Sequence, residues 1–222
     1  MKKRSDEATG LTFGISAYLI WGSFPLIITA ASFANPFEVV VWRVVFGFLF
    51  GALLVSLTKS WRQIVDLIRS PKKLGWVAVA SLFIFINWSV YVVAVATSNV
   101  LETSLGYFIN PLITVLFAVV FLKEKLRPGQ WVALGIGLVA VIILTFDYGR
   151  PPWIALVLAI SFGTYSLAKN RVGGKIRALQ SFTIESGLVL PFAFVQLWVV
   201  SMFSPIMIFS GPLETTILIS FG

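Results

Sequence analysis

The chain has 222 residues, of which 58% are hydrophobic and only 12% are charged, and its net charge is +8. A soluble domain carries about twice this charged fraction, so the composition excludes an ordinary soluble protein and favours a helical membrane protein. The chain has no Cys and no His, which excludes disulfides, zinc–histidine sites and histidine proton relays.

Seven apolar segments follow one another along the chain, each near the length that a helix needs to cross about 30 Å of hydrocarbon. We predict spans at residues 11–31, 39–58, 74–96, 100–122, 130–146, 153–168 and 182–204, of which the fifth and sixth are short. An eighth is expected to begin near Thr215 and to be incomplete at Gly222. The basic residues 1–10 are predicted to form a cytoplasmic tail, because the apolar segment after them is longer than a signal-peptide core of roughly 7–15 residues.

The distribution of positive charge predicts the orientation. All but two of the 17 Lys and Arg residues lie in the tail and in the loops after the second, fourth and sixth segments. The exceptions are Arg150 in an opposite loop and Arg43 inside the second segment. Because Lys and Arg accumulate on the cytoplasmic side, we expect a cytoplasmic N-terminus and short basic loops rather than a nucleic-acid-binding surface.

A short pattern suggests an internal repeat. Trp21-Gly22-Ser23-Phe24 in the first segment and Phe162-Gly163-Thr164-Tyr165 in the sixth share the order aromatic, Gly, hydroxyl, aromatic. Five spans separate their starting points, so two such units would be inverted copies, as in many transporters. We therefore divide the chain into a first five-span unit at 11–146 and an incomplete second unit at 153–222.

Three charged residues fall inside the spans, where an ionised group is costly and needs a reason. Arg43 and Glu102 are at similar depth near the outer side, so an ion pair between them is one prediction, and separate snorkelling of each side chain to the interface is the alternative. Glu185 lies near the inner side of the seventh segment.

Polar and aromatic residues at helical spacing are the candidates for a substrate cavity. Glu102, Gly106 and Asn110 lie on one helical face, and the proline that follows frees a backbone carbonyl. The alternatives are interfacial anchoring for Trp and Tyr, and a kink solvated by neighbouring helices. The GxxxG of Gly47 and Gly51 indicates helix packing. The cavity candidates are Tyr18, Trp21, Gly22, Pro25, Asn87, Trp88, Tyr91, Gly106, Tyr107, Asn110, Pro111 and Tyr165.

Four stretches of the chain are similar to a known family. They are AYLIWGSFPL at 17–26, Asn87-Trp88 followed by Tyr91, LETSLGYFINPL at 101–112, and FLKEKLRPGQW at 121–131. The chain thereby resembles the RarD family, the chloramphenicol-sensitive-protein branch of the drug/metabolite transporter superfamily within the EamA group. The resemblance implies ten spans in two inverted units, both termini in the cytoplasm, and export or exchange of small metabolites or drugs.

The sequence thus predicts an all-α, polytopic membrane protein with EamA-like inverted repeats, the second incomplete. We expect a secondary transporter, an exporter or exchanger of small metabolites or drugs in a bacterial cytoplasmic membrane. The alternatives are a membrane scaffold or assembly protein and an inactive fragment of the transporter. An enzyme is not expected, because the sequence has no His, no Cys and no intramembrane carboxylate pair. Nucleotide-driven pumping is not expected either, because no GxxxxGK[ST] loop is present. The expected partners are the lipid bilayer and a small molecule, without cofactor or metal, and a homodimer stays open.

Overall fold

The structure is a computed structural model of the whole chain, and it describes residues 2–147, 149, 151–172 and 176–219. At residues 2–8, 144 and 147 it describes the backbone but not the side chain. Arg150, Lys175 and Gly222, which enter the predictions above, lie outside the described residues. The described part of the chain forms nine helices and no strand: α1 (Lys2–Ala30), α2 (Pro36–Leu57), α3 (Trp61–Ile68), α4 (Pro71–Ala96), α5 (Val100–Leu122), α6 (Pro128–Asp147), α7 (Trp153–Val172), α8 (Ala178–Phe203) and α9 (Pro212–Ile219).

This arrangement confirms the prediction of a polytopic, all-α membrane protein. By length and composition, the stretch Thr9–Ala30 of α1 and the whole of α2, α4, α5 and α8 can each cross a membrane. Helix α6 has a shorter apolar stretch at Pro128–Ile143, and α7 ends in a turn that contains Lys169 and Arg171. The inverted repeat, with its division at 11–146 and 153–222, stays a prediction.

Several helices extend beyond the apolar segments that predicted them. Helix α1 begins at Lys2 rather than at Leu11, α7 continues to Val172, and α8 begins at Ala178. The reason is that hydropathy marks the part of a helix that meets lipid, whereas Lys, Arg, Gln and Glu are good helix formers and continue the helix beyond it. Residues 2–10 therefore form the first turns of α1, although the sequence predicted them as a tail.

A short helix that the sequence analysis missed lies in the loop after α2. Helix α3 has an apolar side, with Ile64 and Leu67 buried, and a polar side with exposed Arg62 and Asp66. This is the pattern of an amphipathic helix that lies at the edge of an apolar core. Ile64 and Leu67 pack into a cluster with Val55 and Val77 and so close one end of the bundle.

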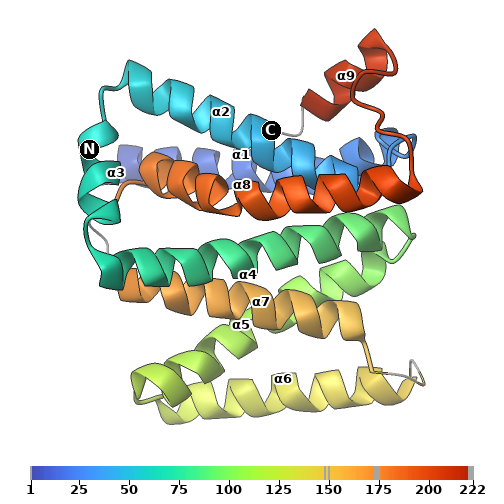
Figure 1. Cartoon of the computed structure of the whole chain (residues 1–222). Coiled ribbons are helices and arrows are strands. Elements are labelled where there is room, and N and C mark those ends of the chain that lie inside the picture. The colour runs from blue at the N-terminus through green and yellow to red at the C-terminus, as the bar shows by residue number, and fades with distance from the viewer. Residues whose placement is uncertain (1, 148, 150, 173–175, 220–222) are drawn as a thin grey trace.

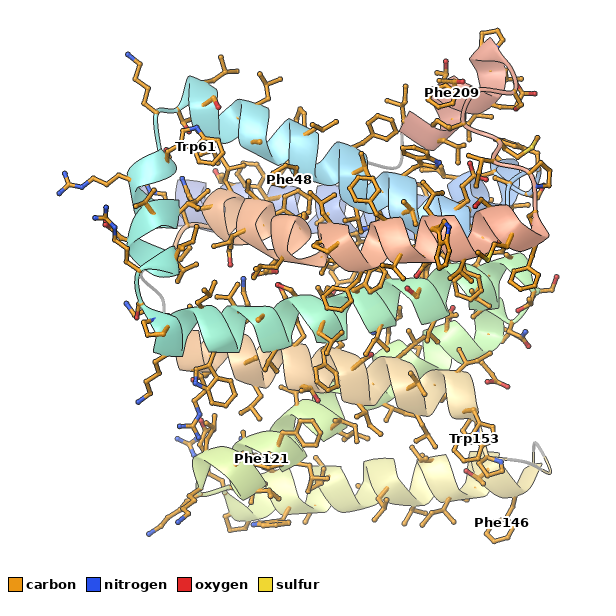
Figure 2. All side chains as sticks on the ribbon, viewed as in Figure 1. Phe48, Trp61, Phe121, Phe146, Trp153 and Phe209 are labelled. Atoms are coloured by element: carbon orange, nitrogen blue, oxygen red, sulfur yellow. The ribbon has the colours of Figure 1, made fainter. Side chains whose placement is uncertain are left out.

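The connections between helices separate into two ends of the bundle. Figure 1 shows the ends of α2, α5 and α7 at the same end of the bundle as α3 and the starts of α4, α6 and α8, on the left of the view. The basic loops predicted from the sequence therefore lie together at this end. Figure 2 shows nitrogen-bearing side chains extending from this end. We call it the basic end, and the other end, which holds the start of α2 and the turn between α8 and α9, the opposite end.

Helices α2, α4, α7 and α8 form the interior, with α5 packed along α7. Close approach depends on glycine at two crossings. A Cβ at Gly51 of α2 would lie 2.6 Å from Thr183 Oγ1 of α8, and one at Gly106 of α5 would lie 3.0 Å from the Ala155 carbonyl oxygen of α7. Gly51 thus has the packing role that the GxxxG pattern indicates.

The periphery of the bundle is apolar and exposed. Helix α6 packs on α5 and none of its described side chains is buried. Most of the described side chains of α1 are exposed, and Leu19 and Trp21 are examples. Figure 2 shows Phe146 pointing away from the bundle. In a membrane protein such a surface faces lipid rather than water.

Candidate functional site

A cavity of about 580 Å³ lies among α2, α4, α7 and α8, with Trp21 of α1 contributing to its lining. Small-molecule sites in proteins usually have volumes of about 300–1,000 Å³ and mostly apolar walls with a few polar groups. This cavity has both features. Trp88 and Phe162 are among the apolar lining residues, and Lys169 and Glu185 are the charged ones.

The polar part of the cavity is formed by two pairs of residues, one pair on each of two helices. Tyr165 and Lys169 are four residues apart on α7, and Ser181 and Glu185 are four residues apart on α8, so each pair lies on one helical face. The two faces meet, and we call these four residues the inner cluster. Its position is near the basic end, because Lys169 is in the last turn of α7 and Ser181 in the first turn of α8.

An ion pair holds the inner cluster together. Lys169 Nζ lies 2.5 Å from Glu185 Oε1 and also donates to Ser181 Oγ. Glu185 Oε1 accepts a second hydrogen bond from the Ser181 hydroxyl at 2.6 Å, and Glu185 Oε2 accepts from the Tyr165 hydroxyl at 3.4 Å. The side chain of Glu185 is 8% exposed, whereas that of Lys169 is 32% exposed. The Glu185 side chain is therefore largely covered by its partners, and the Lys169 side chain is the more exposed member of the pair.

Aromatic rings form a large part of the cavity wall. The rings of Phe162 and Tyr165 are 5.6 Å apart. Trp88 carries the guanidinium of Arg43 over its ring at 4.5 Å, and the same guanidinium lies 5.0 Å from the centre of the Phe24 ring. Cation–π contacts of this kind stabilise a charge in a setting with little water.

The structure places Arg43 and Glu102 in different surroundings. Arg43 lies among aromatic rings, with Tyr91 and Tyr107 close enough to interact with it electrostatically, and the rings of these two tyrosines are 6.0 Å apart. Glu102 is buried in the first turn of α5. An ion pair between Arg43 and Glu102 stays a prediction.

Four predicted site residues come together at the cavity, namely Trp21, Trp88, Tyr165 and Glu185. Among the others, Asn87 joins two helices: it is buried, and its Nδ2 donates to the Leu158 carbonyl and to Ser161 Oγ, both at 3.0 Å. Gly106 lies where α5 crosses α7.

The remaining candidates lie away from the cavity lining. Tyr18 is exposed and packs edge-on against Trp21, and Gly22 is also exposed. Pro25, inside α1, has a carbonyl that accepts from Thr29. On α5, Asn110 Oδ1 accepts from Thr114 Oγ1 at 3.3 Å, beside the exposed Pro111.

Two members of the inner cluster were missed because each lies one residue outside a predicted apolar segment. Lys169 and Ser181 lie outside the predicted spans 153–168 and 182–204, so they were assigned to a loop. The signal that could have found them is the spacing of four residues from Tyr165 and from Glu185, once both helices are extended by one turn.

A third buried carboxylate, in addition to Glu185 and Glu102, lies at the opposite end and was also missed. Glu38 is fully buried in the first turn of α2. Its Oε1 accepts from Trp42 Nε1 at 3.0 Å and from the backbone N–H groups of Met207 and Ile208 at 2.8 and 3.1 Å. It therefore ties α2 to the turn between α8 and α9. Within the residues that the structure describes, no group of three or more Asp and Glu side chains could hold a metal ion.

Comparison with known proteins identifies relatives of the chain. The EamA-like transporter family matches residues 8–146. Protein RarD of Streptomyces exfoliatus is 41% identical over 89% of this chain and 62% of its own length. An uncharacterized transporter of Bacillus subtilis, YojE, is 36% identical over 86% of this chain and 64% of its own length. Protein RarD of Escherichia coli is 31% identical over 95% of this chain and 70% of its own length. The chain thus spans about 62% of the Streptomyces relative.

Proposed function

Because the chain belongs to the EamA-like transporter family, we propose that it acts as a secondary transporter, an exporter or exchanger of small molecules. The observation that supports this proposal is the cavity of about 580 Å³ among α2, α4, α7 and α8. Ionisable side chains within the helices of a membrane protein are rare and commonly mark the pathway of a substrate or ion. The inner cluster contains such a pair, Lys169 and Glu185, and the Lys169 side chain is the more exposed of the two.

We place the protein in a bacterial cytoplasmic membrane with the basic end in the cytoplasm. The support is the collection of basic loops at one end of the bundle (Figure 1) together with the general preference of Lys and Arg for the cytoplasmic side. The chain has no Cys, so single cysteines can report the orientation. A thiol reagent that does not cross membranes should label Ser32→Cys in intact cells and Arg69→Cys only after permeabilisation. Labelling in the reverse order would show that the orientation is inverted.

The transport proposal is tested by comparing the small molecules inside and outside cells that carry or lack the intact gene. We expect at least one compound to accumulate inside cells without the gene, and the gene to restore its export. Trp88→Ala, which removes the largest aromatic side chain that α4 contributes to the cavity lining, should reduce export about tenfold or more, because a Trp at a binding site often contributes more than 1.4 kcal/mol.

The matched control is Trp153→Ala, since Trp153 is exposed on α7 and does not line the cavity. This variant should export normally when it is present in the membrane at the same level. A compound profile that is identical with and without the gene contradicts the transport proposal. Equal losses in both Trp variants would show that the cavity is not the substrate path.

A further inference from the structure

Lys169 is the charged group that the cavity offers to a ligand. Its side chain is 32% exposed, four times the 8% of its partner Glu185. The Glu185 carboxylate is already occupied by Lys169, by the Ser181 hydroxyl and by the Tyr165 hydroxyl. A ligand that enters the cavity therefore meets an ammonium before it meets a carboxylate.

The ammonium also has hydrogen-bonding capacity left. A lysine ammonium has three N–H donors, and two of them are used by Ser181 and Glu185. Glu185 is the only carboxylate among the described residues that line this cavity. The group that best satisfies the third donor is an anionic oxygen, because charge-assisted hydrogen bonds are stronger than those between neutral groups.

The aromatic residues that line the cavity indicate which kind of body the ligand has. Trp21, Trp88 and Phe162 present aromatic surface to the cavity, and such rings bind flat apolar groups by stacking or edge-on contact. Arg43 lies over the Trp88 ring, so a second positive charge lies beside this wall. An amine would gain little here, since it would approach the Lys169 ammonium in order to reach Glu185.

We propose that the cavity binds amphipathic organic anions, that is, molecules with an aromatic or apolar body and one carboxylate. The carboxylate accepts from Lys169, and the body packs against Trp88 and Phe162. Glu185 acts as a positioning residue that holds the ammonium in place through their ion pair. This inference rests on the proposed transport function and specifies its substrate class. A membrane potential that is negative inside drives an anion outward, which fits an exporter.

The test is binding of three indole compounds that share one body and differ in one group. Indole-3-propionate carries a carboxylate, indole-3-propionamide is neutral, and tryptamine carries an ammonium. Titration calorimetry on the purified chain in detergent at neutral pH should give an affinity for the acid about tenfold or more above those for the amide and the amine. This comparison uses the unaltered chain, so it does not depend on how well any variant folds.

Variants then assign the effect to one side chain. Lys169→Met should lower the affinity for the acid about tenfold and leave that for the amide unchanged, while Lys169→Arg should retain binding of the acid. Lys72→Met is the matched control, because Lys72 is exposed at the start of α4 and lies outside the cavity. Its affinities should equal those of the unaltered chain.

Several results would overturn the proposal: tighter binding of the amine, equal binding of acid and amide, no binding of any of the three, or an unchanged affinity for the acid in Lys169→Met. These results are separate from the fate of the transport proposal. Acid binding without export in cells would retain the ligand class and refute transport. Export of an organic cation would retain transport and refute the ligand class.

Discussion

Glu38 and Glu185 are both buried carboxylates on helices that pack together, α2 and α8. They differ in what surrounds them. Two of the three donors to Glu38 are backbone N–H groups of the turn between α8 and α9, whereas the donors to Glu185 are three side chains, those of Tyr165, Lys169 and Ser181. Backbone donors are fixed by the fold, while side-chain donors can change partner by rotating.

The surroundings of the two carboxylates extend this difference to the two ends of the bundle. At the opposite end, Asn35 Nδ2 donates to Ser204 Oγ at 3.2 Å and Gln196 Nε2 donates to the Phe37 carbonyl at 2.8 Å. Together with Glu38 these contacts join the start of α2 to the end of α8. Near the basic end, the same pair of helices borders the cavity. The two carboxylates therefore differ in their donors: those of Glu38 join the two helix ends, whereas those of Glu185 belong to the cluster that we propose as part of a binding site.

The largest expected effect that tests this comparison is the loss of the Glu38 carboxylate. Glu38→Ala leaves the Trp42 indole and the N–H groups of Met207 and Ile208 without their acceptor in a buried place. Each unsatisfied buried group costs about 1–3 kcal/mol, so we expect a loss of about 3 kcal/mol or more in the free energy of unfolding. The measurement is thermal or denaturant unfolding of the purified chain in detergent, followed by tryptophan fluorescence.

Glu185→Ala is the matched substitution on α8. It leaves the Lys169 ammonium, whose side chain is partly exposed, and the Tyr165 and Ser181 hydroxyls. All three are side-chain donors that can rotate toward water in the cavity, so we expect a smaller loss, of about 1–2 kcal/mol. Glu38→Gln should recover part of the stability, since it keeps an acceptor oxygen but places an N–H₂ group where Glu38 Oε2 has no partner among the described residues. Equal destabilisation by the two Ala variants would remove the distinction between joint and site.

The sequence predicted the helices well and the sites only in part. Apolar segments and basic loops are set by the membrane, which acts on every residue of a span, so the spans could be read from composition along the chain. The inner cluster depends instead on the contact between α7 and α8. No local pattern shows that Lys169 faces Glu185, because a lysine at the end of an apolar segment is also what cytoplasmic loops contain.

Glu38 and Asn87 also have contacts with distant parts of the chain that no local sequence pattern predicts. Glu38 lies one residue before the predicted second span, where hydropathy suggests an exposed position, and its burial depends on a turn nearly 170 residues later in the chain. Asn87 was predicted only as a candidate for the substrate cavity. Its partners, the Leu158 carbonyl and Ser161, belong to α7, and only the packing of α4 against α7 reveals that it joins helices.

The smallest expected effect comes from the removal of a single serine hydroxyl group at either end of the bundle. Ser204 accepts from Asn35 at the opposite end, and Ser181 donates to Glu185 in the inner cluster. Truncation to alanine removes this one hydrogen bond of Ser204, worth about 0.5–1.5 kcal/mol, and it removes two at Ser181, which also accepts from Lys169. If the opposite end is a structural joint, Ser204→Ala should lower the free energy of unfolding by about this amount and leave binding of indole-3-propionate unchanged. Ser181→Ala should alter that binding severalfold, because Lys169 loses one of its two partners and its ammonium is less well positioned. Unfolding and calorimetric titration of both variants measure the two quantities, and a binding change in Ser204→Ala together with none in Ser181→Ala would reverse the assignment of the two ends.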